Sequence, residues 1–103
     1  MSKRLAYLEK VTTEGSQDAF TWYALAIEYG GQERIDDAVR TYESLRAIDP
    51  GYVPQYLMCG QMLAKAKRAE EARAWLTAGL EVAQKKGDTH AYGEMENVLA
   101  GLE

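Results

Sequence analysis

The stretch from Trp22 to Pro50, WYALAIEYGGQERIDDAVRTYESLRAIDP, carries apolar residues at helical spacing on both sides of a short polar break. A spacing of i, i+3, i+4, i+7 is typical of amphipathic helices. Pro50 cannot continue a helix, and it pushes Asp49 out of helical geometry. Gly51 then allows the chain to reverse. The sequence therefore predicts two helices joined by a tight turn and ended by a sharp stop.

The same spacing continues through most of the chain, so we expect six helices separated by short turns. Their ranges are 2–13, 18–30, 34–48, 53–66, 69–86 and 88–102. Helix ends are marked by acidic first turns, a first-turn proline and a Gly-Asp step, at Asp36-Asp37, Pro54, Glu70-Glu71 and Gly87-Asp88. Short turns make successive helices pack antiparallel. The predicted fold class is all-α, an array of antiparallel helix hairpins.

The chain also repeats itself when it is shifted by 34 residues. The shift aligns Trp22 with Tyr56, Leu25 with Cys59, Ala26 with Gly60, Tyr29 with Leu63, Ala38 with Ala72, Tyr42 with Leu76 and Leu45 with Gly79. Large residues meet large ones, and two pairs of small residues coincide. Antiparallel helices approach closely only where neither carries a bulky side chain at the crossing. The small pairs therefore predict the crossing points.

This pattern resembles the tetratricopeptide repeat, a helix–turn–helix of 34 residues with large, small and proline residues at fixed positions. The resemblance covers 19–52 and 53–86, roughly two-thirds of the chain. The chain departs from the family pattern at three positions. It has Leu45 where the family often has a small residue, Leu63 where an aromatic residue is usual, and Gln84 where proline is usual. The resemblance implies a single domain over 1–103, a tetratricopeptide-like α–α superhelix. It has a capping helix within 2–16 and another at 88–102.

Both ends carry a charged side chain at the position where the repeats have a small one. At the N-terminal end Leu8 and Val11 fit the packing positions of a second helix, and Arg4 takes the small position. With two residues inserted, the C-terminal end fits a first helix through Tyr92, Met95 and Leu99, with Glu96 at the small position. We expect both helices to be caps, which repeat arrays need for solubility. The alternative is a chain cut from a longer array.

Composition narrows the function further. The 103 residues suit one domain, and the net charge of −4 with a pI near 5.0 argues against nucleic acid and against an anionic membrane surface. The N-terminus lacks the apolar stretch of a signal peptide, and no window approaches the ~20 apolar residues of a membrane span. One cysteine gives no disulfide framework. We expect a cytoplasmic protein that needs no cofactor or metal.

Catalytic patterns are weak. Cys59 and His90 are the single residues of their types, and a nucleophilic pair would need both in one cleft with an orienting group. Cys59 falls on a predicted core position, where a free cysteine behaves as a small hydrophobe. Gly30-Gly31 follows a helix and lacks the residues of a phosphate-binding loop. The sequence predicts that the protein is not an enzyme.

The resemblance implies that the first helices line a concave groove that binds a peptide or protein segment. Carried over by position, the groove residues are Phe20, Tyr23, Ile27, Leu57, Gln61, Lys65, His90 and Asn97. Aromatic and aliphatic residues would supply the binding energy, and Gln61, Lys65 and Asn97 would set the orientation of the bound segment. The alternative is that Phe20, Tyr23 and Leu57 are core residues shared between helices.

A protein–protein interaction scaffold is the leading interpretation. A second is a homo-oligomerisation module, a homodimer for example, whose aromatic surface forms a self-interface. An enzyme accessory subunit is a remote third. The partner itself is not encoded in any motif of the sequence.

Overall fold

The computed structural model describes residues 2–102 and is all-α over that range. Its six helices are α1 (Lys3–Thr13), α2 (Ala19–Gly31), α3 (Ile35–Ile48), α4 (Val53–Lys65), α5 (Ala69–Lys86) and α6 (Thr89–Ala100). Each observed boundary lies within two residues of the predicted one. The predicted fold class is confirmed.

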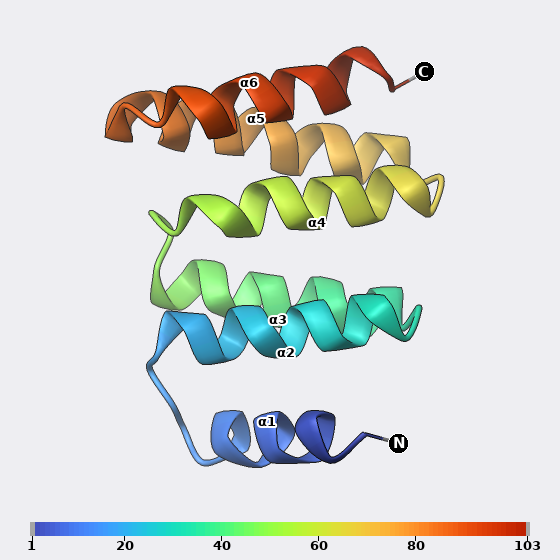
Figure 1. The fold of residues 1–103 in the computed structure, drawn as a ribbon, viewed down its shortest axis with the longest axis vertical. Helices are drawn as coiled ribbons and strands as arrows, with labels where there is room; N and C mark the ends of the chain where they lie inside the picture. Colours follow the sequence, from blue (N-terminus) through green and yellow to red (C-terminus); the bar gives the residue numbers. More distant parts are fainter. Residues whose placement is uncertain (1, 103) are drawn as a thin grey trace. The chain divides into compact units, whose positions relative to one another are not determined.

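The chain forms two compact units that meet in sequence at the Pro50–Gly51 step. In the first unit α2 packs against α3, and α1 packs against α2 (Figure 1). In the second unit α4 packs against α5, and α6 packs against both. The division falls at the break that Asp49 and Pro50 impose on the sequence. The finer organisation of the chain, two repeats with a capping helix at each end, stays a prediction.

Two side-chain caps and one left-handed glycine mark helix ends, and two of these three, at Gly87 and Asp88, were predicted from the sequence. The Ser2 Oγ accepts a hydrogen bond from the Leu5 backbone N at 2.9 Å, and the Asp88 Oδ1 accepts one from the Ala91 backbone N at 3.0 Å. These two caps begin α1 and α6. Gly87 ends α5 in the left-handed conformation, with φ 71°, which a residue without Cβ adopts at no steric cost.

The turn inside each helix hairpin is repeated in detail. Glu33 and Lys67 both adopt left-handed backbone conformations, with φ 60° and 66°. The next residue in each turn, Arg34 or Arg68, folds its guanidinium back onto a carboxylate three residues later, with Nε–O distances of 2.9 Å and 2.8 Å. A non-glycine residue in this conformation costs about 1–2 kcal/mol. The repetition therefore extends from side-chain size to backbone geometry.

In the second unit, two glycines allow the helices to approach closely. A Cβ on Gly60 would lie 2.4 Å from the Leu76 Cγ, and a Cβ on Gly79 would lie 2.4 Å from both the Met95 Sδ and the Tyr56 Cβ. Contacts this short require a neighbour to move. Gly60 does lie at a close approach of α4 and α5, but the residue that faces it is Leu76 and not the small Ala72 of the prediction. Gly79 creates a second close contact that includes α6.

The first unit has its core on both sides of α2. Leu5 and Leu8 of α1 cluster with Leu25 of α2. Ala26 of α2 and Ala38 of α3 are fully buried at 0% exposure. These small residues were the predicted crossing pair of the first hairpin. One stripe of α2 thus packs against α1 and another against α3.

Candidate protein-binding faces

Three predicted groove residues lie on α2 at a spacing that places them on one side of the helix. Phe20 is 60% exposed, whereas Tyr23 and Ile27 are half-buried. Residues spaced by three and four positions are neighbours on a helix surface. The core interpretation of Phe20 is therefore wrong, because most of its side chain contacts solvent. We call Phe20, Tyr23 and Ile27 the α2 face.

Three further residues form a stripe along α4. Leu57 is half-buried, and Gln61 and Lys65 are exposed. The spacing of four residues keeps all three on one side of the helix. The stripe begins apolar and ends with an amide and an ammonium group, so it offers one hydrophobic contact followed by hydrogen-bonding and charged groups.

The last two predicted residues lie two turns apart on α6, about 10 Å along the helix axis. Both are exposed, with the His90 side chain at 87%. The His90 Nε2 lies 2.8 Å from the Glu94 Oε1, one turn further along the helix. Asn97 projects from the last turn. Because α6 packs against α4, we group Leu57, Gln61, Lys65, His90 and Asn97 as the α4–α6 face.

The structure thus places the eight predicted residues in two sets. Three occur in the first unit and five in the second. Helix spacing places the first set on one side of α2 and three members of the second set on one side of α4. The other two members lie on α6, which packs against α4. Their role in binding stays a prediction.

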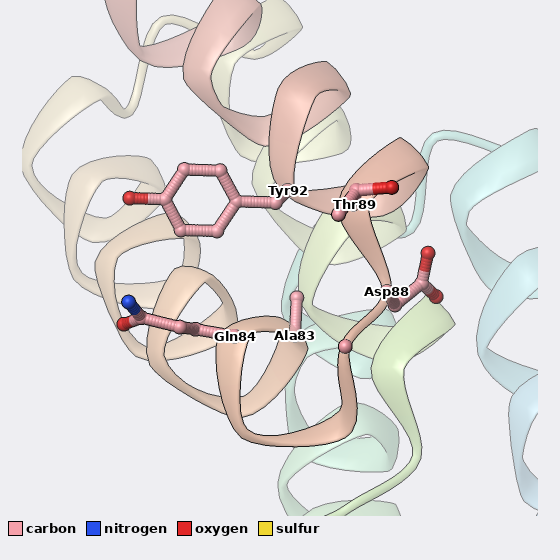
Figure 2. Close-up of a pocket in the computed structure, with 6 residues that line it drawn as sticks. Ala83, Gln84, Asp88, Thr89 and Tyr92 are labelled. Atoms are coloured by element: carbon pink, nitrogen blue, oxygen red, sulfur yellow. The ribbon is translucent and has the colours of Figure 1, made fainter.

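Sequence reasoning missed a hollow of about 350 Å³ at the junction of α5 and α6. Its lining residues are Ala83, Gln84, Gly87, Asp88, Thr89 and Tyr92. The Tyr92 ring and the Gln84 side chain extend on the same side of the junction (Figure 2). The lining combines apolar surface with hydrogen-bonding groups of Gln84, Asp88, Thr89 and Tyr92. The Gly87-Asp88 step was visible in the sequence, but it indicated only a helix end.

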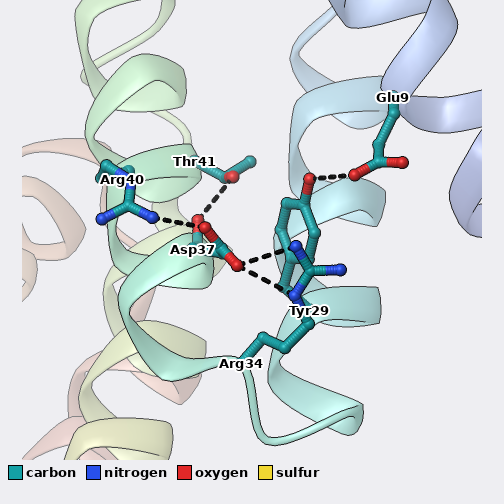
Figure 3. Close-up of polar contacts among 6 residues, drawn as sticks. All are labelled: Glu9, Tyr29, Arg34, Asp37, Arg40 and Thr41. Atoms are coloured by element: carbon teal, nitrogen blue, oxygen red, sulfur yellow. Dashed lines mark hydrogen bonds and ion pairs between the residues drawn. The ribbon is translucent and has the colours of Figure 1, made fainter.

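Sequence reasoning also missed a polar network in the first unit (Figure 3). The Tyr29 hydroxyl donates to the Glu9 Oε2 at 2.5 Å, and this bond links α2 to α1. The Arg34 guanidinium lies 4.6 Å from the centre of the Tyr29 ring. Arg34 and Arg40 both pair with Asp37. The network therefore runs from α1 across α2 to the first turns of α3.

The electrostatics of this network suit a structural role. Burial, and then the hydrogen bond to Glu9, raise the pKa of Tyr29 from 10.0 to about 12. A phenol with this pKa stays protonated at neutral pH, so Tyr29 acts as a fixed hydrogen-bond donor and not as a nucleophile. The hydrogen bond from Arg34 lowers the pKa of Asp37, which keeps that carboxylate charged.

The cysteine and the histidine lie in different environments. Cys59 is fully buried, and the exposed His90 pairs with Glu94. These positions do not place the two side chains in one cleft. Within residues 2–102, no group of three or more His, Cys, Asp or Glu side chains could hold a metal ion.

Over the described part of the chain, none of the helices combines the length and the apolar character that crossing a bilayer requires.

Antiparallel helix pairs with small residues at their crossings define a helical-hairpin repeat protein. A tetratricopeptide-repeat family model matches residues 31–93, which is more than half of the chain. The chain therefore belongs to the tetratricopeptide repeat family. The family assignment predicted from the sequence is confirmed.

Solved structures agree with this assignment. A crystal structure of a tetratricopeptide repeat domain protein from Salinibacter ruber is 30% identical, with a TM-score of 0.71, covering 81% of this chain and 93% of that one. A solution structure of a tetratricopeptide repeat domain protein from the same organism is 31% identical, with a TM-score of 0.75, covering 84% and 90%. A Bordetella parapertussis protein, 24% identical with a TM-score of 0.81 over 97% and 87%, shares the fold. None of the curated proteins compared with the chain matches it.

Membership of the family defines a broad class of function. The tetratricopeptide fold is generally a protein–protein interaction module, and its members are typically scaffolds without catalytic activity.

Proposed function

We propose that this protein is an interaction scaffold that binds peptide or protein segments through two faces, the α2 face of the first unit and the α4–α6 face of the second. The observation that carries the proposal is Phe20, an aromatic side chain held 60% exposed on α2. Tyr23 and Ile27 lie beside it on the same side of the helix. Aromatic side chains, including phenylalanine, are enriched in protein interfaces relative to the rest of the protein surface.

The α4–α6 face supports the proposal with different chemistry. Leu57 supplies an apolar contact, and Gln61 and Asn97 carry amides that can donate to and accept from a peptide backbone. Lys65 adds a positive charge that favours a segment with a nearby carboxylate. We therefore expect the partner segment to combine an apolar or aromatic anchor with an acidic residue.

Binding without catalysis is part of the same proposal. The side chains that could react each have a structural explanation. Cys59 is buried, His90 pairs with Glu94, and Tyr29 stays protonated. The exclusion of nucleic acid and the cytoplasmic location stay predictions from the sequence.

The test uses peptides selected from a random display library against the immobilised chain. Phe20→Ser should weaken the selected peptides about tenfold, the effect of losing one central anchor. The matched control is Tyr7→Ser, because Tyr7 is an equally large aromatic side chain, 64% exposed, on α1. Tyr7→Ser should leave the affinity unchanged.

A second variant tests both faces at once. Tyr23→Ala combined with Leu57→Ala should abolish peptide binding while circular dichroism shows a folded chain. Unchanged affinity in this double variant and in Phe20→Ser would overturn the proposal.

A further inference from the structure

α1 exposes an aromatic side chain at a position that is buried in both repeats. Tyr7 is 64% exposed. Shifts of 34 residues along the chain relate Tyr7 to Thr41 on α3 and then to Trp75 on α5, which are 7% and 8% exposed. The Trp75 ring lies 5.9 Å from the ring of Tyr56, on the first helix of its own hairpin. Tyr7 therefore occupies a position that the second unit covers with a first helix.

α6 presents the matching features of a first helix. In the register with two inserted residues, Tyr92 corresponds to Tyr56, and Glu96 corresponds to Gly60. Tyr92 and Leu99 are half-buried, and Glu96 is exposed. Tyr92 also lines the hollow of about 350 Å³, which leaves room for a ring beside it. α6 thus resembles a first helix, and among the described helices it packs against α4 and α5 only.

The charges of α1 and α6 are complementary. α1 carries three basic side chains and one carboxylate, whereas α6 carries two carboxylates and His90. At the position where the repeats have Ala38 and Ala72, α1 has Arg4, and where α4 has Gly60, α6 has Glu96. The Arg4 side chain is 61% exposed even though its Nε lies 2.9 Å from the Glu28 Oε1. A cation and an anion therefore occupy the two helix positions at which the repeats carry small residues.

We propose that α6 of one molecule binds α1 of a second copy of this chain, so that the two helices complete a hairpin across the junction. Tyr7 of one copy packs beside Tyr92 of the other, as Trp75 packs beside Tyr56 within the second unit. Arg4 faces Glu96 across the junction. The inference goes beyond the proposed function and uses residues outside the α2 face and the α4–α6 face.

The geometry of this contact determines the kind of assembly. The two surfaces differ, so the contact is heterologous, and each added copy leaves one α1 and one α6 available. Long side chains at the crossing hold these helices further apart than Gly60 and Leu76 are held. The association is therefore weak, driven partly by exposed charges, and weakened by salt.

Light-scattering molar mass, measured on the full chain over a wide concentration range, tests the proposal. At low ionic strength the mean mass should rise past that of a dimer without a plateau. At about 1 M salt, where the screening length is about 3 Å, the rise should shrink. Arg4→Glu and Glu96→Arg should each weaken the association about tenfold, because each places like charges opposite each other.

Exchanging the charges of Arg4 and Glu96 should restore the association that each single variant loses. The double variant R4E/E96R, or an equimolar mixture of the two single variants, should regain most of the lost association. Glu28→Gln is the matched control for Arg4→Glu, because it removes the intrachain partner of Arg4 and leaves the junction charges intact. It should leave the association unchanged.

Aromatic variants keep the test independent of charge and of any loosening of α1. Tyr7→Ser should weaken the association, and Phe20→Ser should not. Four outcomes would overturn the proposal. The first two are a monomer at every concentration and a closed dimer that Arg4→Glu does not affect. The others are an association lost in Phe20→Ser but kept in Tyr7→Ser, and a charge exchange that restores nothing. Peptide affinity is measured separately, so these outcomes leave the proposed function standing.

Discussion

The two helices at the ends of the described chain are attached in different ways. α1 is joined to α2 by polar bridges, Glu9 to Tyr29 and Arg4 to Glu28, around a small apolar cluster. α6 is held by close packing, because Gly79 leaves room for the Met95 side chain against α5. Met95 is fully buried. The comparison shows that one repeat fold can attach a terminal helix by specific polar pairs or by close packing.

Filling the space at Gly79 should have the largest effect on this comparison. Gly79→Leu places side-chain atoms where the Tyr56 Cβ and the Met95 Sδ already lie. We expect about 3 kcal/mol less stability in urea unfolding, the upper range for overpacking a core. Hydrogen exchange should show the protection of α6 falling first.

Gly93 is the matched control for the substitution of Gly79. It lies in α6 with nothing within 4 Å of an added Cβ. Gly93→Ala should leave stability equal or raise it by about 0.5–1 kcal/mol, because alanine favours the helix. If Gly79→Leu were as well tolerated as Gly93→Ala, close packing would not hold α6.

Removing the bridge between α1 and α2 should have a smaller effect. Tyr29→Phe deletes the hydroxyl that donates to Glu9. We expect a loss of about 1 kcal/mol, measured by urea unfolding, since the acceptor is charged but only partly buried. In a double-mutant cycle with Glu9→Gln, the two changes should cost less together than the sum of the single costs. Strict additivity would show that the bond contributes nothing to the attachment of α1.

Removing the N-caps of α1 and α6 should have a smaller effect on stability, and it compares the two helices directly. Ser2→Ala removes the cap of α1, and Asp88→Ala removes the cap of α6. Each should cost about 0.5–1 kcal/mol. Asp88→Ala should cost more in global stability than Ser2→Ala, because Asp88 caps α6 with a carboxylate, which also interacts favourably with the positive N-terminal end of the helix. Equal costs in thermal unfolding would show that the two caps contribute alike.

A pH dependence specific to the first unit should be the smallest effect. The pKa of Tyr29 is about 12 in the folded protein, against an ordinary tyrosine value of 10.0 that we assign to the unfolded chain, so folding favours the protonated phenol. This contribution is complete below pH 10 and is lost as the pH rises from 10 towards 12. Stability should therefore fall less steeply over this range in Tyr29→Phe than in the parent chain.

Much of the fold could be predicted because its determinants are local. Period and end signals located every helix, and Gly60 marked a close crossing because a small residue recurs there in the repeat. The Glu9–Tyr29 bridge could not be predicted, since it joins residues twenty positions apart. Tyr29 also satisfied the pattern as an apolar packing residue. The left-handed Glu33 and Lys67 gave no signal, because neither is a residue that favours positive φ.

The candidate site was predictable in outline. Helical spacing places Phe20, Tyr23 and Ile27 on one side of α2, but it cannot tell how deeply each is covered. Coverage depends on the neighbouring helices, which left Phe20 exposed and the other two half-buried. The hollow beside Tyr92 depends on how α5 and α6 meet after Gly87, and a sequence pattern does not specify that geometry.

The most direct test of the binding account is amide chemical-shift mapping by NMR while a library-selected peptide is titrated into the labelled chain. The account predicts that the largest shifts occur around Phe20, Tyr23 and Ile27 on α2 and around Leu57, Gln61 and Lys65 on α4, with smaller shifts near His90 and Asn97 on α6. Largest shifts confined to α3 and α5 would contradict it.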